Sequence, residues 1–383
     1  MTVDLVLVGG GLANLLLAWR LADLRPDLRF LVIEQGPAVG GNHTWSYHGT
    51  DLEPEARGWV GQLARMSWPA SEVRFPLYTR RLAGSYHSLD SADLAARATA
   101  RFGDRIRVTT AARRIGPSTV ELSDGTVLQA GAVIDGRGFD GRVQMALGYQ
   151  RFLGLELRLT APHGLTAPLL MDATVAQEDG YRFIYVLPFG PDVVLIEDTV
   201  YGDQPVHDEG RSRRVIEQYL ATRGWSVAAE LRQERGALPI PLAGRYQDVA
   251  DIQEPGVPTI GVRAGLIHPT TGYSLPYAAR TADLIARAPT LTSAALIGSL
   301  TELARATFKR QRFLRMLNRL LFRAAEPADR YRVLQKFYRL PEPTIARFYA
   351  DRLTTMDKIR LLTGRPPVPV VRALACLPER IDS

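Results

Sequence analysis

The fold is decided by the stretch Asp4-Leu5-Val6-Leu7-Val8-Gly9-Gly10-Gly11-Leu12-Ala13-Asn14. A short apolar run leads directly into a glycine turn, and a helical pattern follows from Leu15 to Leu24. A second apolar run, Phe30 to Ile33, ends in Glu34. The order of strand, glycine turn, helix, strand and acid is typical of a βαβ unit that binds a dinucleotide.

Each part of this unit has a physical role in holding a dinucleotide. Gly9 permits the tight turn, and Gly11 lets the backbone approach a pyrophosphate. The N–H groups at the start of the helix, at Leu12 and Ala13, are expected to point at the phosphates. Glu34 follows the first glycine by about 25 residues and is placed to accept a hydrogen bond from a ribose hydroxyl.

One position of the glycine motif departs from the usual pattern. Asn14 stands where a third glycine normally permits close packing of helix against strand. A tight turn in a βαβ unit without a ligand therefore remains an alternative at this point.

The composition bounds the class of protein. The 383 residues are 46% hydrophobic and 23% charged, which predicts a globular chain of two or three domains. The single cysteine, Cys376, excludes a disulfide framework and a cysteine-based metal cluster, and it fits a reducing cytoplasm. We expect no signal peptide and no spanning helix, because no apolar run approaches about 18 residues. No metal site is predicted.

The net charge of +7 raises the question of an acidic partner. No nucleic-acid motif is present, so nucleic acid is not expected. Much of the excess lies in residues 308–323, where arginines alternate with apolar residues at helical spacing. The stretch predicts a basic amphipathic helix that lies on an anionic membrane, or one that packs on its own domain with a solvated basic face.

The remaining elements follow from local pattern. A helix is expected over residues 91–102, with Ser91 as its N-cap, and a hairpin over residues 120–128, with Asp-Gly at its turn. A buried strand over residues 131–134 leads into Asp135-Gly136-Arg137-Gly138. Residues 258–261 read as a further short strand.

The middle and the end of the chain have different characters. Residues 181–187 and 192–201 alternate and are rich in aromatic and β-branched side chains, which predicts an antiparallel pair that forms one wall of a cavity. Residues 291–365 are mainly helical in pattern, with a capping box at Thr354 and Asp357.

A second glycine-containing segment, residues 261–272, has the length and the proline and glycine spacing of the second flavin motif of aromatic-hydroxylase-type flavoproteins. Pro269 and Gly272 fall where that motif has them, before a helix, whereas Val262 occupies the usual aspartate position. An ordinary strand-to-helix turn is the alternative. The chain has no cysteine pair and no second Gly-x-Gly-x-x-Gly motif, which argues against ordinary flavin oxidation chemistry.

Two adjacent carboxyl groups, Glu197 and Asp198, lie in the strand expected over residues 192–201. Alternation puts Glu197 on the face of Val193 and Leu195, and Asp198 on the opposite face. One carboxyl can therefore enter an apolar cavity, where desolvation raises its pKa and allows it to carry a proton at neutral pH. Two solvated acids at a strand end remain the alternative.

Taken together, the chain resembles bacterial lycopene β-cyclases from Asp4 to about Pro367. The resemblance rests on the following segments: the Gly9–Asn14 turn, Gly40-Gly41-Asn42-His43-Thr44-Trp45, Val133-Ile134-Asp135-Gly136-Arg137-Gly138, Met171-Asp172-Ala173-Thr174-Val175, Leu195-Ile196-Glu197-Asp198-Thr199 and His268-Pro269-Thr270-Thr271-Gly272-Tyr273-Ser274-Leu275-Pro276. Asn14 and Val262 are not departures from this family.

The resemblance implies an isomerase that closes both linear ends of lycopene into β-rings, through γ-carotene to β-carotene. It implies FAD in its reduced form, with NAD(P)H as reductant, although the reaction is redox-neutral. Carried over by position, Glu197 is the essential carboxylate and Asp198 supports it. The implied cofactor contacts are Gly9, Gly11, Leu12, Ala13, Glu34, Asn42, Asp135, Gly136, Arg137, Thr270, Thr271 and Gly272.

The implied fold is α/β: a Rossmann-like FAD domain of the aromatic-hydroxylase type, an antiparallel substrate domain and a helical C-terminal region. The expected boundaries are 1–66, 86–146 and 241–290 for the FAD domain, 67–85 and 147–240 for the substrate domain, and 291–383 for the helical region. The implied location is the cytoplasm, at the inner face of the cell membrane, in contact with lipid and with other carotenoid enzymes.

Two other functions fit the same motifs. One is a flavin-dependent oxidoreductase, either a hydroxylase or an isoprenoid reductase. The other is a non-catalytic flavoprotein that carries a carotenoid. Product mass separates them, because a cyclase leaves the mass unchanged, a reductase adds hydrogen, a hydroxylase adds oxygen and a carrier returns its ligand unaltered.

Overall fold

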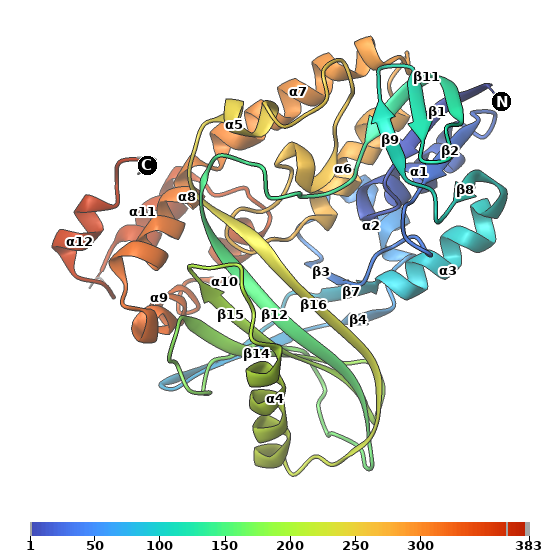
Figure 1. The fold of residues 1–383 in the computed structure, drawn as a ribbon. Coiled ribbons are helices and arrows are strands. Elements are labelled where there is room, and N and C mark those ends of the chain that lie inside the picture. Colours follow the sequence, from blue (N-terminus) through green and yellow to red (C-terminus); the bar gives the residue numbers. More distant parts are fainter. Residues whose placement is uncertain (1, 365–366, 380–383) are drawn as a thin grey trace.

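The computed structural model describes residues 2–364 and 367–379, and it contains two large sheets and one small sheet (Figure 1). The N-terminal sheet has the order β8-β2-β1-β11-β10-β9. Its strands, in chain order, are β1 (Thr2–Val8), β2 (Phe30–Ile33), β8 (Ile106–Arg107), β9 (Ala112–Ile115), β10 (Thr119–Leu122) and β11 (Val127–Asp135).

The predicted βαβ unit is present at the start of this sheet. Helix α1 (Leu12–Leu24) joins β1 to β2, which lie parallel, and β11 returns parallel to β1 on its other side. The predicted hairpin turns at Gly125, whose φ of 85° requires a residue without a Cβ. Its second strand continues unbroken through residues 131–134, so two strands expected from the sequence form one.

Helices cover one face of this sheet and bury its apolar residues. Helix α1 packs between the sheet and α6 (Leu275–Ala286), which explains why Leu15, Leu16 and Leu17 are all fully buried. The same hydrophobic core includes residues of α2 (Pro54–Gly61), of α3 (Ser91–Phe102) and of the start of α7 (Ser293–Arg310).

The second sheet is longer and mostly antiparallel, with the order β16-β12-β15-β14-β13-β5-β6. Helix α4 (Glu209–Arg223) packs on one of its faces, at the bottom of the molecule in Figure 1. The strands are β5 (Ser71–Phe75), β6 (Tyr78–Leu82), β12 (Ala146–Leu159), β13 (Leu169–Asp172), β14 (Tyr181–Pro188), β15 (Val193–Gly202) and β16 (Val227–Ala243). The predicted antiparallel pair is therefore β14 and β15.

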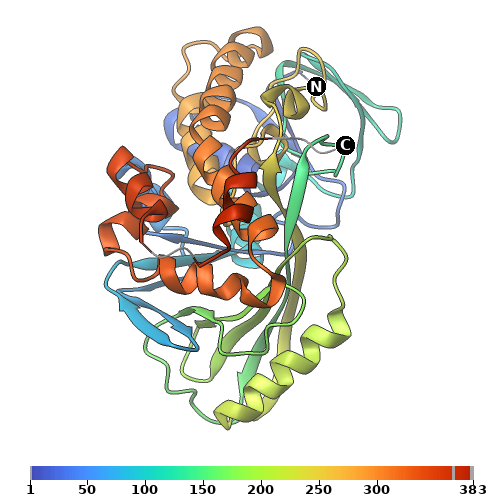
Figure 2. The same cartoon turned by 90° about the vertical axis from the view of Figure 1, so that its left-hand side faces the viewer.

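The remaining elements are one small sheet and a group of short helices. The small sheet has the order β3-β7-β4, from β3 (Thr44–His48), β4 (Met66–Trp68) and β7 (Tyr86–Asp90). The C-terminal helices lie against the other face of the long sheet (Figure 2). They are α8 (Arg312–Arg319), α9 (Arg330–Phe337), α10 (Glu342–Tyr349) and α11 (Thr355–Leu362). Helix α12 (Val370–Ala375) contacts residues 320–324 instead, and α5 (Tyr246–Ala250) precedes α6.

These elements confirm the predicted fold class, an α/β flavoprotein-type sheet with an antiparallel sheet and a helical C-terminal region. The capping box at Thr354 is present. The proposed domain boundaries stay a prediction. No helix among the described residues is long and apolar enough to cross a membrane.

Two local predictions are wrong. The N-cap of α3 is Asp90, whose side chain accepts from the Asp93 N–H, whereas Ser91 accepts from His43 N–H instead. Residues 258–261 form no strand, because Thr259 makes only an isolated bridge to Asp135 and Gly261 already begins a 3₁₀ turn.

The arginine-rich stretch also differs from its prediction. The helix ends at Arg310 and restarts as α8, and Arg315 and Arg319 are buried rather than solvated. The Arg319 guanidinium donates to the carbonyls of Leu242 (2.6 Å), Cys376 (2.8 Å) and Leu377 (3.0 Å). These two arginines hold the C-terminal segment against β16 instead of facing solvent, so the expected solvated basic face is wrong at Arg315 and Arg319. Contact of the rest of the stretch with a membrane stays a prediction.

Candidate active site

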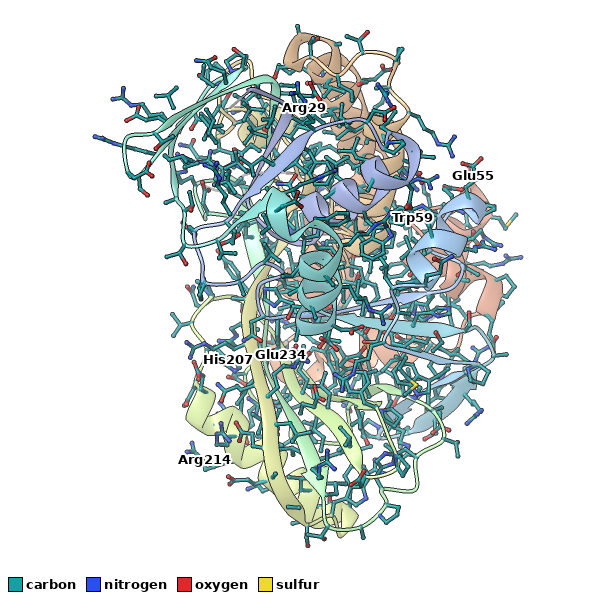
Figure 3. The ribbon with its side chains drawn as sticks, turned by 90° about the vertical axis from the view of Figure 1, so that its right-hand side faces the viewer. Arg29, Glu55, Trp59, His207, Arg214 and Glu234 are labelled. Carbon is teal, nitrogen blue, oxygen red and sulfur yellow. The ribbon has the colours of Figure 1, made fainter. Side chains whose placement is uncertain are left out.

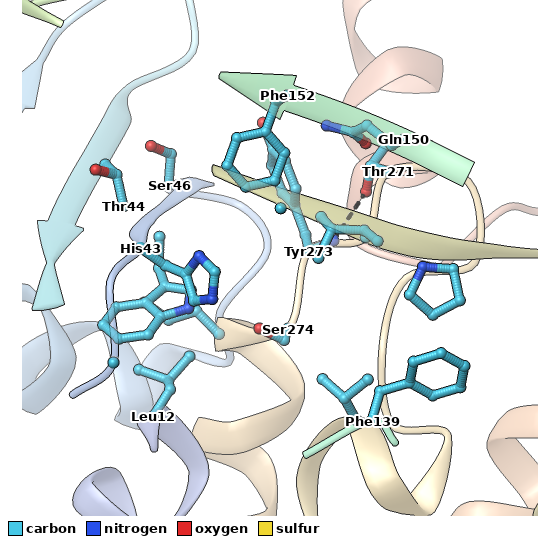
Figure 4. A pocket seen from close by; sticks show the side chains of 18 of the residues that line it. Leu12, His43, Thr44, Ser46, Phe139, Gln150, Phe152, Thr271, Tyr273 and Ser274 are labelled. Atoms are coloured by element: carbon cyan, nitrogen blue, oxygen red, sulfur yellow. Dashed lines mark hydrogen bonds between the residues drawn. The ribbon is translucent and has the colours of Figure 1, made fainter. Parts of the chain in front are cut away.

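A cavity of about 560 Å³ lies where the N-terminal sheet, the small sheet and the long sheet meet (Figure 4). The starts of α1 and α6 form one side of it, with Leu12 and Ser274. Strand β12 forms another, with Gln150 and Phe152. The cavity therefore has a backbone-rich wall and a wall of side chains from the antiparallel sheet.

The backbone-rich wall carries the features that an anionic cofactor needs. Six of the predicted contacts line it, and these are Gly11, Leu12, Ala13, Gly136, Thr271 and Gly272. Helices α1 and α6 both begin here without a side-chain cap, and neither has an acid in its first turn. Their free N–H groups and positive dipole ends therefore face the cavity, as binding of a pyrophosphate requires.

The glycines of the first turn fit a dinucleotide such as FAD. A Cβ at Gly11 would meet no atom within 4 Å, so this position opens directly onto the cavity. Gly9 has a φ of 96°, and a Cβ there would lie 2.8 Å from the Gly136 carbonyl oxygen. Gly9 thus shapes the turn, and Gly11 leaves room that a phosphate would fill.

Asn14 explains how the turn does without a third glycine. Its side-chain amide donates to the carbonyls of Val8 (2.9 Å) and Gly9 (2.8 Å) and ties helix to strand. A Cβ at Gly136 would lie 2.5 Å from Asn14 Nδ2. The close approach is therefore provided by Gly136, at the end of β11, instead of by the helix.

Other predicted cofactor contacts lie beside the cavity and do not form its wall. Glu34 accepts from the N–H groups of Gly10 and Gly36, each at 2.7 Å, and Asn42 donates to Gln233 O. Asp135 is fully buried between Arg137 (2.8 Å) and Arg263 (3.0 Å). Gly9 and Thr270 likewise do not line the cavity. Their roles toward a cofactor stay predictions.

Glu197 of β15 lines the cavity, whereas Asp198 does not. Glu197 Oε1 accepts from the Thr199 hydroxyl at 2.5 Å. Asp198 lies on the opposite face, where it accepts from Ser212 of α4 (2.5 Å) and lies 3.4 Å from Arg182 Nε. The strand alternation predicted from the sequence thus separates the two carboxyls, and one of them enters the cavity.

Burial gives Glu197 the properties of an acid at neutral pH. Desolvation, and then the neighbouring charge of Glu234, raise the pKa of the Glu197 carboxyl to about 8. Burial also raises the pKa of Asp198, although Arg182 and Ser212 oppose the shift. Glu197 therefore carries a proton at pH 7 and faces an apolar space.

Aromatic rings surround this carboxyl. The phenyl, phenol and indole rings that line the cavity belong to Trp45, Phe139, Phe152, Phe183, Tyr185, Tyr201, Tyr273 and Tyr349. The Tyr185 hydroxyl bonds to Ser46 Oγ (2.7 Å) and Tyr86 Oη (2.9 Å), so its polar end is already satisfied. The His43 imidazole also lines the cavity, whereas Tyr181 of the neighbouring strand packs in the core.

The family model for "Lycopene cyclase protein" matches residues 4–375. The chain belongs to the lycopene cyclase family. It is 50% identical to a lycopene beta-cyclase of Pseudescherichia vulneris, over 99% of each chain. It is 46% identical to a lycopene beta-cyclase of Pantoea ananas, over 98% of this chain and 97% of that one.

Solved structures with a similar fold are flavoprotein-like. A geranylgeranyl bacteriochlorophyll reductase-like protein from Thermoplasma acidophilum aligns with a TM-score of 0.60 at 15% identity, covering 98% of this chain and 99% of its own. A probable FAD-dependent monooxygenase from Pseudomonas aeruginosa aligns at 0.56 and 18% identity, covering 87% and 98%. At such identities the likeness shows that this cyclase-family chain has the FAD-dependent monooxygenase fold.

Sequence reasoning missed several cavity residues of this family member. Gly40 and Gly41 line the cavity with φ of 92° and 73°, and the glycine pair itself was the signal. Phe139 and Leu238 also line it, but neither belongs to a recognisable motif. Among the described residues no group of three or more His, Cys, Asp or Glu side chains is arranged to hold a metal ion.

Proposed function

We propose that this protein is a lycopene β-cyclase, an isomerase that converts the linear ends of lycopene to β-rings. The observation that carries the proposal is Glu197, a buried carboxyl whose pKa of about 8 keeps it protonated beside aromatic rings in an apolar cavity. The family membership and the relatives named lycopene beta-cyclase support the same function.

The chemistry requires a proton, a dry cavity and a means of stabilising a cation. Protonation of the terminal double bond gives a carbocation, the next double bond attacks it, and loss of a ring proton completes the ring. Glu197 can exchange the proton, and the faces of Tyr185 and Tyr201 provide π-density near the cation. The apolar lining keeps out water that would quench the cation.

The backbone wall suits FAD as the resident cofactor. The helix N-termini at Leu12 and Leu275 would hold its phosphates, and Gly11 would leave room for them. Reduced FAD, when bound, would supply negative charge next to the cationic centre. NAD(P)H is the proposed source of its electrons.

The rival functions differ in their redox balance. A hydroxylase or an isoprenoid reductase on this fold would consume reducing equivalents with each product, and a carrier would change nothing. A protonated carboxyl in the cavity is what a cyclase requires and a carrier does not. A reductase also adds a proton to the double bond, so it is the relatives named lycopene beta-cyclase that favour the cyclase over the reductase.

Turnover is expected to need reduced flavin and to consume no net hydride. With the flavin reduced anaerobically by dithionite, each protein molecule should convert many lycopene molecules, because the rearrangement is redox-neutral. In a parallel anaerobic sample reduced by NADPH instead of dithionite, the rings formed and the NADPH oxidised are counted together. Oxidation of one NADPH per ring formed would contradict the proposal, as would a single turnover per flavin.

We also propose that the protein works in the cytoplasm, docked on the inner face of the cell membrane, where lycopene and γ-carotene dissolve and other carotenoid enzymes can meet it. Exposed apolar side chains on two C-terminal helices support a contact there. They are Met356, Ile359 and Leu362 of α11, and Val370, Val371 and Leu374 of α12. Arg312, Arg360 and Arg372, each about half exposed or more, accompany them and complement anionic lipid.

Replacing both Val371 and Leu374, which are 81% and 60% exposed, with Glu should lower binding to anionic liposomes by about ten-fold or more. Co-sedimentation measures the bound fraction, which should also fall with salt for the unmodified protein. The matched control is Val206→Glu, at an apolar residue that is 75% exposed and belongs to neither α11 nor α12. Equal losses in the two variants, or no loss in either, would reject α12 as the contact.

A further inference from the structure

A second buried carboxyl, Glu234 of β16, shares a row of the long sheet with Glu197. Gly154 of β12 pairs with Glu197 on one side and with Glu234 on the other. Residues directly opposite in antiparallel strands project to the same face, so the two carboxyls flank Gly154 on one face. Their Cα atoms are separated by two strand spacings, about 10 Å. Figure 3 shows Glu234 midway along β16.

The missing side chain at Gly154 lets Glu234 reach toward Glu197. A Cβ at Gly154 would lie 2.8 Å from Glu234 Cγ and 3.2 Å from Glu234 Oε1. The Glu234 side chain therefore lies over the glycine, across the middle strand. Glu234 is 2% exposed and does not line the cavity, so it can act on a substrate only through Glu197.

The two carboxyls have different hydrogen-bond donors. Glu234 Oε2 accepts from Arg232 Nη1 and from the Thr44 hydroxyl, each at 2.8 Å, and Arg232 Nη2 in turn donates to Thr44 at 2.8 Å. Glu197 has one neutral donor, Thr199. A guanidinium stabilises a carboxylate far more than a hydroxyl does, so the negative charge of the pair belongs on Glu234.

We infer that Glu234 is a positioning residue for the proposed cyclisation: its carboxylate, ionised against Arg232 and Thr44, holds the proton of the pair on Glu197. This inference rests on the proposed function. It adds the direction of the first proton transfer, which runs from Glu197 to the substrate. The resting protein presents Glu197 as an acid, ready to give its proton to the substrate.

The surroundings support this division of charge. Burial raises the pKa of both carboxyls, and the charge of Glu234 is the second cause of the shift at Glu197. The other titratable or charged groups that act on Glu197 are Asp198 of its own strand and Arg232 of β16, and those that it acts on are Tyr185 and Tyr201. Arg232 also bonds to Glu156 at 3.2 Å, which Arg65 holds at 2.6 Å.

The test is the pH profile of cyclisation in Glu234→Gln. Glu197 must be protonated to donate, so wild-type activity falls as the pH rises through about 8. Removing the Glu234 charge lowers the pKa of Glu197 and should move this fall about one pH unit lower, a loss of about fivefold at pH 8 and almost none at pH 6. Glu234→Asp keeps the charge and should keep the wild-type profile.

Glu230→Gln is the matched control, because Glu230 lies on the same strand in an exposed pair with Arg213. The inference would be overturned if Glu234→Gln lost the same fraction of its activity at every pH. It would also be overturned if the pH profile of the control moved as far as that of Glu234→Gln. If the wild-type protein forms no cyclised product at any pH, the proposed function fails instead.

A second readout needs neither turnover nor a folded Glu234 variant. Infrared difference spectra of the wild-type protein should contain, at pH 7, the C=O band of a buried carboxylic acid. Subtracting the spectrum of Glu197→Gln from that of the wild-type protein should leave this band. Asp51 is also a buried carboxyl whose pKa burial raises to about 7, but it contributes to both spectra and cancels. Absence of the band from the subtracted spectrum would overturn the inference, because the proton would then not lie on Glu197.

Discussion

Replacing Glu197 with Gln is expected to lower the rate of lycopene cyclisation by about 10²–10⁴-fold, the contribution of a positioned general acid. Gln keeps the size and the bond to Thr199 but cannot deliver a proton. The change leaves the glycine turns untouched, so the variant should retain flavin like the wild-type protein. Pigment analysis after incubation with lycopene measures the loss, and flavin absorbance measures retention.

Asp198→Asn is the paired control. Asp198 lies on the other face of β15 against Ser212 and Arg182, so its amide variant should keep measurable activity. The assignment fails if Glu197→Gln cyclises at nearly the wild-type rate. It also fails if the Asp198 variant is inactive while the Glu197 variant is not.

Gly11→Val is expected to abolish flavin retention in a folded protein. A Cβ added at Gly11 would point into open space in the cavity, and the φ of −79° at this position is accessible to any residue. The variant should therefore fold, and its side chain should occupy the volume where a pyrophosphate would approach the backbone. Flavin content per protein is measured by absorbance after gel filtration, and circular dichroism checks the fold.

Gly58→Val is the matched control, because a Cβ at Gly58 in α2 also meets nothing within 4 Å but lies away from the cavity. Full flavin occupancy in folded Gly11→Val would mean that the cofactor does not approach this turn. Loss of flavin in both variants would mean that the effect is general destabilisation.

The sequence allowed prediction of features that depend on local pattern. The βαβ unit follows from apolar runs and glycines that are close in the chain, and the separation of Glu197 from Asp198 follows from strand alternation. The roles of Gly11 and Gly272 in the cavity wall were predictable for the same reason, since each precedes a helix whose N-terminus faces the cavity.

Features that depend on pairing between distant strands could not be predicted. Glu234 comes beside Glu197 only through the register of three strands, with Gly154 between them, and no local motif encodes that register. The same limit applies to Arg319, whose spacing reads as a solvated basic face. Its actual partners are backbone carbonyls of β16 and of the segment after α12, more than fifty residues away.

The most direct test of the account is the mass and ring content of the pigment that the chain produces in lycopene-accumulating cells, beside cells that express Glu197→Gln. The account predicts that the wild-type chain yields a carotenoid with the mass of lycopene and a β-ring at each end, and that the variant leaves lycopene unchanged. A product heavier by hydrogen or oxygen, or unaltered lycopene with the wild-type chain, would contradict it.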